Sequence, residues 1–165
     1  MCSLINPAKI SATAARNEPS KPILQVEPYL FFEGRCEEAL EYYRRKLGAE
    51  VIALIRFKDR PPGQDAADGG PAPELAEKVM HANFRIGDTT FMASDGRSEP
   101  PPSFQGFSLS ITASDDAHAE KFFAALSEGG RVQMPLAKTF YASRFGMVVD
   151  RFGISWMIIS GAASR

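Results

Sequence analysis

Residues 23–48 read ILQVEPYLFFEGRCEEALEYYRRKLG and change character halfway along. The first part, 23–32, is mostly apolar and predicts a strand. In the second part, buried-type side chains recur at the spacing of one helical face: Cys36, Ala39, Leu40, Tyr43 and Leu47. Gly48 is well placed to end this helix, because glycine readily adopts the left-handed conformation found just past helix ends. The stretch therefore predicts a strand followed by an amphipathic helix.

Three short segments rich in β-branched and aromatic residues come next: AEVIALIRF (49–57), KVMHANFRI (78–86) and TTFMAS (89–94). Their composition is typical of strands. The last two are separated only by Gly87-Asp88, a pair that suits a tight hairpin turn.

The same order returns in the second half of the chain. GFSLSIT (106–112) precedes SDDAHAEKFFAALSEGG (114–130), where Ser114 or Asp115 can cap a helix. Strand candidates RVQMPL, ASRFGMVV and ISWMIIS follow. We therefore predict an α+β fold of two tandem βαβββ modules, 23–96 and 104–160, with curved mixed sheets around a shared cavity and the helices outside.

Composition limits the classes of partner. The chain has 165 residues, 44% of them hydrophobic, and a formal net charge of −1. It shows neither a long apolar run nor a basic excess, so we expect no membrane and no nucleic-acid partner. Cys2 and Cys36 have no metal-type or disulfide-type spacing, which favours a cytoplasmic location. We interpret residues 1–22 as a flexible extension and 60–74, rich in Pro and Gly, as a loop without regular structure.

Counting outward from the hairpin turns assigns side chains to the two faces of each sheet. In the first hairpin Arg85 should oppose Thr90, Asn83 should oppose Met92 and His81 should oppose Ser94. In the last hairpin Val148 should oppose Ser155, Gly146 should oppose Met157 and Arg144 should oppose Ile159. The side chains expected to line the cavity are then His81, Asn83, Met92, Ser94, Arg144, Ser155 and Met157.

Each of these side chains has a functional and a structural interpretation. His81 is the candidate catalytic residue, as a general base near neutral pH, or a strand histidine bonded to a neighbour. Arg144 and Arg85 suit an anionic ligand, or instead pair with acidic side chains. Met92 and Met157 would give an apolar ligand an adaptable lining. Tyr29, Phe31, Phe140 and Tyr141 could stack on a planar ligand or serve as ordinary core aromatics.

Four segments carry a family resemblance. EPYLFFEGRCEEALEYYRRKLGAE, KVMHANFRIGD, FMASDG and MPLAKTFYASRFGMVVDRFGISWMI resemble the PhnB-like branch of the glyoxalase, bleomycin-resistance and dioxygenase superfamily, also called the vicinal oxygen chelate (VOC) fold. The resemblance implies the βαβββ repeat and frequent homodimers, sometimes with exchanged modules. It does not fix an activity, because one fold hosts many functions. Nothing in the sequence resembles a glycine-rich nucleotide-binding loop.

Metal-dependent members of the superfamily hold one divalent ion with two ligands from each module. The corresponding positions here fall at 27–29, Met92, 106–108 and Met157. Of these residues only Glu27 suits a hard cation, because thioethers are poor ligands for Mg, Mn, Fe(II) or Zn. We therefore expect no metal and no cofactor.

Three functions remain open from the sequence. The favoured one is a metal-free protein that binds a small, partly apolar molecule, neutral or anionic, between the modules. It either only binds this molecule or catalyses a reaction that needs no metal. The second is a metal-dependent lyase, isomerase or dioxygenase of the glyoxalase type. The third is a structural or regulatory dimer without ligand.

Overall fold

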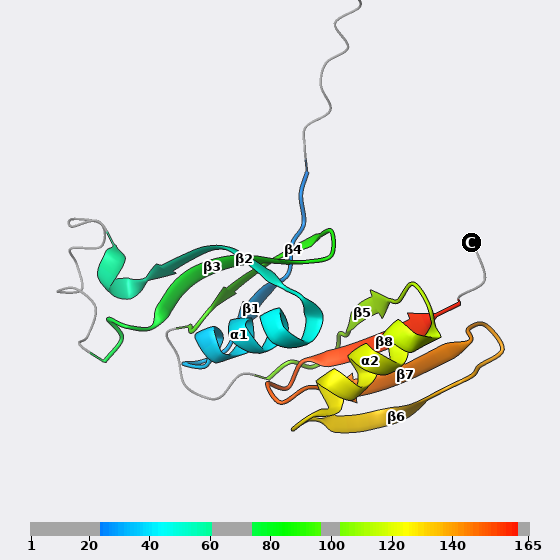
Figure 1. Cartoon of the computed structure of the whole chain (residues 1–165). Helices are drawn as coiled ribbons and strands as arrows, with labels where there is room; N and C mark the ends of the chain where they lie inside the picture. Colours follow the sequence, from blue (N-terminus) through cyan, green and yellow to red (C-terminus); the bar gives the residue numbers. More distant parts are fainter. Residues whose placement is uncertain (1–23, 61–73, 97–102, 162–165) are drawn as a thin grey trace, which may run out of the picture.

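The computed structural model describes residues 24–60, 74–96 and 103–161 (Figure 1). The predicted extension, 1–22, lies outside the described residues. So does the predicted loop 60–74, except for its first and last residues.

The first module is a four-stranded mixed sheet with one helix. Its elements are β1 (Tyr29–Phe31), α1 (Cys36–Leu47), β2 (Glu50–Arg56), a short 3-10 helix (Phe57–Asp59), β3 (Val79–Ile86) and β4 (Thr89–Ser94). The strand order is β1-β4-β3-β2, with β1 parallel to β4 and the other pairs antiparallel. Gly48 ends α1 in the left-handed conformation, as its position predicts.

The second module repeats this topology. Its elements are β5 (Leu109–Thr112), α2 (Asp116–Ser127), β6 (Arg131–Ala137), β7 (Arg144–Val149) and β8 (Ser155–Ser160), in the order β5-β8-β7-β6. Asp115 caps α2 by accepting a hydrogen bond from the His118 backbone N–H at 2.8 Å. The predicted α+β fold of two tandem βαβββ modules is therefore confirmed.

The two modules pack with their helices in the middle, not outside as expected. Tyr43 of α1 stacks at 6.1 Å on Phe84 of its own sheet and meets Trp156 of the second sheet edge-on at 5.8 Å. The Tyr42 hydroxyl donates to the Ala125 carbonyl of α2 at 2.7 Å. Figure 1 shows α1 on the side of its sheet that faces the second module. Because α1 carries large aromatic side chains toward both sheets, one continuous core forms around it.

The faces without a helix, here called the open faces, therefore turn away from each other within one chain. The first open face carries Tyr29 and Phe31 with Asn83 and Met92. The second open face carries three methionines and a serine, as described below. Among the described residues, the expected cavity between two facing sheets therefore does not form inside a single chain.

The strand register of the first hairpin matches the prediction. Arg85 pairs with Thr90 and Asn83 with Met92 across the Gly87-Asp88 turn. Ala82, Phe84 and Ala93 lie on the helix side and are almost fully buried.

The register predicted for the last hairpin is wrong by one residue. Val149 pairs with Ser155, and Gly146 with Ile158. The cause is the Asp150 carboxylate, which accepts backbone N–H bonds from Phe152 and Ile154 at 2.9 and 3.0 Å. These bonds include Ile154 in the turn, so the pairing starts one residue later.

This shift reverses the faces of β7 but leaves β8 as predicted. Trp156 and Ile158 lie on the helix side, with Ser155 and Met157 opposite. On β7 the helix side receives Gly146, which the predicted pairing with Met157 had placed on the cavity side. A Cβ on Gly146 would meet Phe123 of α2 at 2.8 Å. A one-residue change inverts a strand because successive side chains point to opposite faces.

Candidate functional site

Cross-strand pairing gathers the predicted side chains of the first module on the first open face. Ala53, Asn83, Met92 and Tyr29 form one row across all four strands. In the next row Ile55 pairs with His81, and Phe31 pairs with Ser94. The structure thus places His81, Asn83, Met92 and Ser94 on one surface, which β1 borders with aromatic rings.

His81 is held by its neighbour on β1. Its Nδ1 lies 3.0 Å from the Tyr29 hydroxyl, and the two rings are 5.7 Å apart. This contact corresponds to the structural interpretation of His81, a strand histidine satisfied by a hydroxyl. It also fixes the Tyr29 ring at the edge of the sheet.

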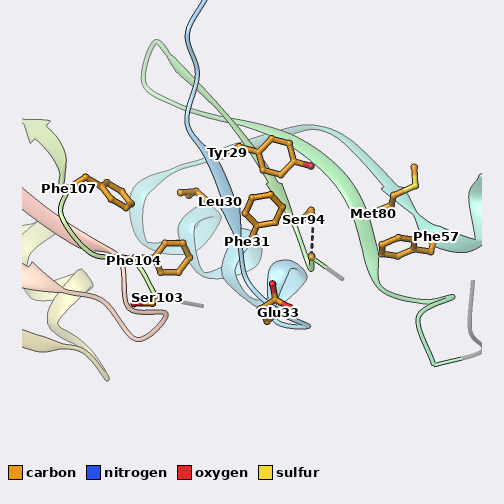
Figure 2. A pocket seen from close by; sticks show the side chains of 11 residues that line it. Tyr29, Leu30, Phe31, Glu33, Phe57, Met80, Ser94, Ser103, Phe104 and Phe107 are labelled. Carbon is orange, nitrogen blue, oxygen red and sulfur yellow. Dashed lines mark hydrogen bonds between the residues drawn. The ribbon is translucent and has the colours of Figure 1, made fainter. Parts of the chain in front are cut away.

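A pocket of about 700 Å³ lies along β1 (Figure 2). Its lining side chains come from β1, the following turn, the β2–β3 region, the end of β4 and the start of the second module: Tyr29, Leu30, Phe31, Glu33, Phe57, Met80, Ser94, Gly96, Ser103, Phe104 and Phe107. Tyr29 and Phe31 stack with their ring centroids 4.8 Å apart, and Phe104 meets Phe107 edge-on at 6.4 Å. Aromatic surface therefore dominates the pocket.

Of the predicted cavity residues, only Ser94 lines this pocket. Its hydroxyl accepts a hydrogen bond from the Gly96 N–H at 2.8 Å, drawn in Figure 2. Tyr29 and Phe31 were among the aromatic candidates, whereas Phe140 and Tyr141 lie elsewhere, with Phe140 99% exposed.

The sequence did not predict seven of the lining residues: Leu30, Glu33, Phe57, Met80, Gly96, Ser103 and Phe104. Phe107 fell within 106–108, the range predicted for the third metal position, and not among the expected cavity residues. A register irregularity between Ile55 and Arg56 pairs Arg56 with Val79, so the strict alternation of β3 is broken at Met80. Such an irregularity has no clear sequence signal. Except for Leu30 on β1, the remaining residues sit in turns and connections, whose position depends on how the modules pack.

Glu33 enters the pocket on an unusual backbone. Its φ is 46°, a value that non-glycine residues seldom adopt, and Gly34 follows with φ 90°. The carboxylate lies against Gly96, where any Cβ would overlap it. In Figure 2 the carboxylate points up toward the Phe31 side of the pocket.

The second open face carries a methionine row. Met134, Met147, Met157 and Ser110 pair across its four strands. The predicted residues Ser155 and Met157 lie on this face, and the Ser155 hydroxyl is 2.7 Å from that of Ser108. In this chain they are not brought together with His81 or Asn83, because the two open faces are directed apart.

The prediction that Arg144 faces the cavity is wrong. Owing to the register shift, Arg144 lies on the α2 side and pairs with Asp116 at 3.3 Å and Glu120 at 3.2 Å. Arg85 pairs with Glu50 at 2.5 Å. Both guanidinium groups thus have acidic partners, as the structural interpretation of these arginines predicts.

The superfamily's metal positions hold the wrong donors for a divalent ion. Parallel pairing aligns Tyr29 with Met92 and Ser110 with Met157, which moves the third position from 106–108 to Ser110. A phenol, a hydroxyl and two thioethers do not match the preferences of Mg, Mn, Fe(II) or Zn. Within ranges 24–60, 74–96 and 103–161, no three His, Cys, Asp or Glu residues cluster as metal ligands would. The residues present do not fit the ion.

Cys36 is fully buried at the start of α1, and its N–H donates to Asp95 at 2.7 Å. Burial raises the pKa of its thiol far above the usual range, and the Asp95 charge adds to this. A thiol in this environment is not a nucleophile near neutral pH.

In the part of the chain that is described, no helix has the length and apolar character needed to cross a membrane.

Comparisons with known proteins identify the family of the chain. A family model described as 3-demethylubiquinone-9 3-methyltransferase matches residues 24–159. Protein YjdN of Escherichia coli is 36% identical over 140 residues, which cover 82% of this chain and 94% of that protein.

Solved structures share both sequence and fold. Protein PA1353 from Pseudomonas aeruginosa is 42% identical, with a TM-score of 0.72 over 83% of this chain and 97% of that one. A putative 3-demethylubiquinone-9 3-methyltransferase, PhnB protein, from Bacillus cereus is 25% identical, with a TM-score of 0.68 over 84% and 100%. A glyoxalase-related enzyme from Fulvimarina pelagi shares only the fold, at 14% identity and a TM-score of 0.54 over 83% and 88%. The chain therefore belongs to the PhnB-like 3-demethylubiquinone-9 3-methyltransferase family of that model, and it shares the fold of the glyoxalase-related enzyme.

Proposed function

We propose that this protein binds a small, partly apolar molecule in the pocket along β1, without the divalent metal of its superfamily, and that it acts as a homodimer. The observation that carries the proposal is the pocket of about 700 Å³ with aromatic walls. Its rings are accessible, since Tyr29 is 38% exposed, Phe31 48% and Phe107 44%. A concave apolar site with a few polar groups is the usual form of a small-molecule site.

The metal-free part of the proposal depends on donor chemistry. Met92 and Met157 occupy two of the positions from which relatives with a metal site would bind it. A soft thioether cannot replace a carboxylate or imidazole at a hard or borderline ion. A metal-dependent glyoxalase-type reaction would need ligands that these positions do not offer.

The homodimer is supported by apolar side chains on both open faces. Phe31 and Ile55 on the first open face, and Met134 on the second, are each at least 39% exposed. Apolar surface gathered on a sheet face is typical of an interaction site. In a twofold dimer, the first open face of each chain could cover the second open face of the other. That arrangement would form between chains the cavity that one chain does not form alone.

Ligand binding is tested by thermal-shift and calorimetric screening with aromatic compounds, small acids and thiol conjugates. We expect stabilisation by the apolar aromatic class, about 2.7 kcal/mol at 100 times the Kd. Phe31→Ala should weaken binding, whereas Phe140→Ala, outside the pocket, should not. If no class of compound stabilises the protein, a structural or regulatory dimer without ligand becomes the better account.

Metal content is tested by elemental analysis of the purified protein. We expect less than a tenth of an equivalent of Mn, Fe, Ni or Zn. One tightly bound equivalent, together with loss of an activity on chelation, would favour the glyoxalase-type lyase, isomerase or dioxygenase instead.

The dimer is tested by sedimentation velocity. We expect the wild type to sediment as a dimer and the double variant Ile55→Glu, Met134→Glu to sediment as a folded monomer. Lys121→Glu, an exposed change on α2, is the control and should stay dimeric. A monomeric wild type at micromolar concentration would contradict the proposal.

The cytoplasmic location expected from the cysteine pattern stays a prediction.

A further inference from the structure

Glu33 is the only charged side chain among the described residues that line the pocket. The polar remainder consists of the Tyr29 hydroxyl and two serines, Ser94 and Ser103. The Ser94 hydroxyl is already bonded to the Gly96 N–H, and the Tyr29 hydroxyl lies against His81. The charge that a bound molecule meets here is therefore negative.

The turn itself does not require a glutamate at this position. Residues 32–35 form a tight turn in which the Arg35 N–H donates to the Phe32 carbonyl at 3.2 Å, with positive φ at Glu33 and Gly34. Such positions favour Asn, Asp or Gly, whereas a longer side chain is strained there. Gly96, with φ 71°, leaves the space that the carboxylate occupies. Backbone strain of this kind is often found where a side chain has a functional role.

Neighbouring cations are engaged with other groups. The Lys78 ammonium donates to the Gly34 carbonyl at 3.2 Å, and Arg35 forms its ion pair with Glu38 at 2.9 Å. Among the described residues, the ion pairs of the surrounding cations are formed with carboxylates other than Glu33. The Glu33 carboxylate can therefore accept a cation from a ligand without first breaking one of these salt bridges.

The aromatic walls complement this charge. The stacked pair Tyr29 and Phe31 and the edge-on pair Phe104 and Phe107 present rings around the same space as Glu33 (Figure 2). Ring faces attract cations, and several rings beside a carboxylate suit a quaternary ammonium, which needs no hydrogen bonds. We infer that the pocket selects organic cations with an aromatic or apolar body; this inference rests on the proposed binding function and names its ligand class.

Calorimetry with three probes of similar size tests the inference: benzyltrimethylammonium, benzyl alcohol and phenylacetate. We expect the cation to bind at least about tenfold more tightly than the other two, with an affinity that falls as salt is raised. Glu33→Gln should weaken cation binding about tenfold and leave benzyl alcohol unchanged. Glu33→Asn, which suits the positive φ, removes the same charge and should behave alike even if the Gln variant folds poorly. Asp88→Asn, at an exposed turn position that does not line the pocket, is the control for loss of one negative charge.

The outcomes distinguish failure of the cation preference from failure of the proposed binding function. Equal binding of all three probes, weakened alike by Phe31→Ala, would overturn the cation preference and leave the binding function in place. Unchanged cation affinity in both Glu33 variants would also overturn the preference. Absence of binding by every probe class would overturn the binding function and the preference together.

Discussion

The Tyr43 hydroxyl on α1 donates a 2.7 Å hydrogen bond to the Asp150 carboxylate, which lies in the β7–β8 turn of the other module. The same carboxylate accepts from the Trp156 indole at 2.8 Å and from the N–H groups of Phe152 and Ile154. Burial raises the pKa of Asp150, and these hydrogen bonds oppose the increase. One buried carboxylate thus sets the register of the last hairpin and ties the modules together.

Tyr43→Phe should destabilise the protein by about 1.5–3 kcal/mol, because it removes a hydrogen bond to a buried acid. Tyr42→Phe is the comparison. Its hydroxyl donates to a neutral carbonyl at 2.7 Å, so the loss should be nearer 1 kcal/mol. Urea unfolding measures both. If both variants lose the same free energy of unfolding, the hydrogen bond to Asp150 stabilises the fold no more than the bond to the neutral Ala125 carbonyl.

Asp150→Asn should lower the free energy of unfolding by about 3 kcal/mol or more, which is a larger loss than that expected for Tyr43→Phe. The amide NH₂ would face the indole N–H or the turn N–H groups, so at least one buried donor would lose its acceptor. Chemical denaturation again gives the value. A near-neutral Asn variant would contradict the described bonding of the turn.

Gly146→Ala tests the corrected register of β7. The new methyl group would meet Phe123 at 2.8 Å and the Leu136 backbone at 2.9 Å, so we expect about 1–3 kcal/mol of destabilisation. Met147→Leu on the open face conserves volume and should cost less than about 1.5 kcal/mol. If Gly146 instead lay on the open face, Gly146→Ala would leave the free energy of unfolding nearly unchanged, and the corrected register would be wrong.

Cys36 should resist alkylation while the protein is folded. In a Cys2→Ser background, where Cys36 is the remaining thiol, iodoacetamide at pH 8 should react at least about a hundredfold more slowly than in denaturant, since reaction then requires opening of the fold. Mass spectrometry follows the rate. Rapid labelling of the native protein would show that α1 opens easily at its first turn.

The Asp115 cap should make the stability of the fold fall as the pH is lowered. Hydrogen bonds from the His118 backbone and ring lower the pKa of Asp115 to about 2. A depressed acid stabilises the fold above its unfolded pKa of about 3.9 and loses this contribution as the pH falls toward 2. The difference in Tm between wild type and Asp115→Asn should therefore be present at pH 6 and vanish near pH 2. A difference that persists unchanged at pH 2 would exclude a charge effect.

Local patterns in the sequence determined the elements of each module. Helical spacing from Cys36 to Leu47 and the Gly48 stop predicted α1, and Gly87-Asp88 predicted the first hairpin together with its faces. These features depend on backbone periodicity and on turn residues a few positions apart. The family was implied separately, by the resemblance of four segments to PhnB-like proteins.

Tertiary structure decided where the surfaces of the modules lie. Asp150 lengthened the last turn through bonds to Phe152 and Ile154, and this moved Arg144 from the expected cavity to the acidic side chains of α2. Tyr43 packs between two sheets, so the helices meet in the middle and the open faces turn outward. The pocket joins β1 to Phe104 and Phe107, which are distant in sequence. Local periodicity encodes which face of a strand is apolar, but only packing between modules determines what that face meets.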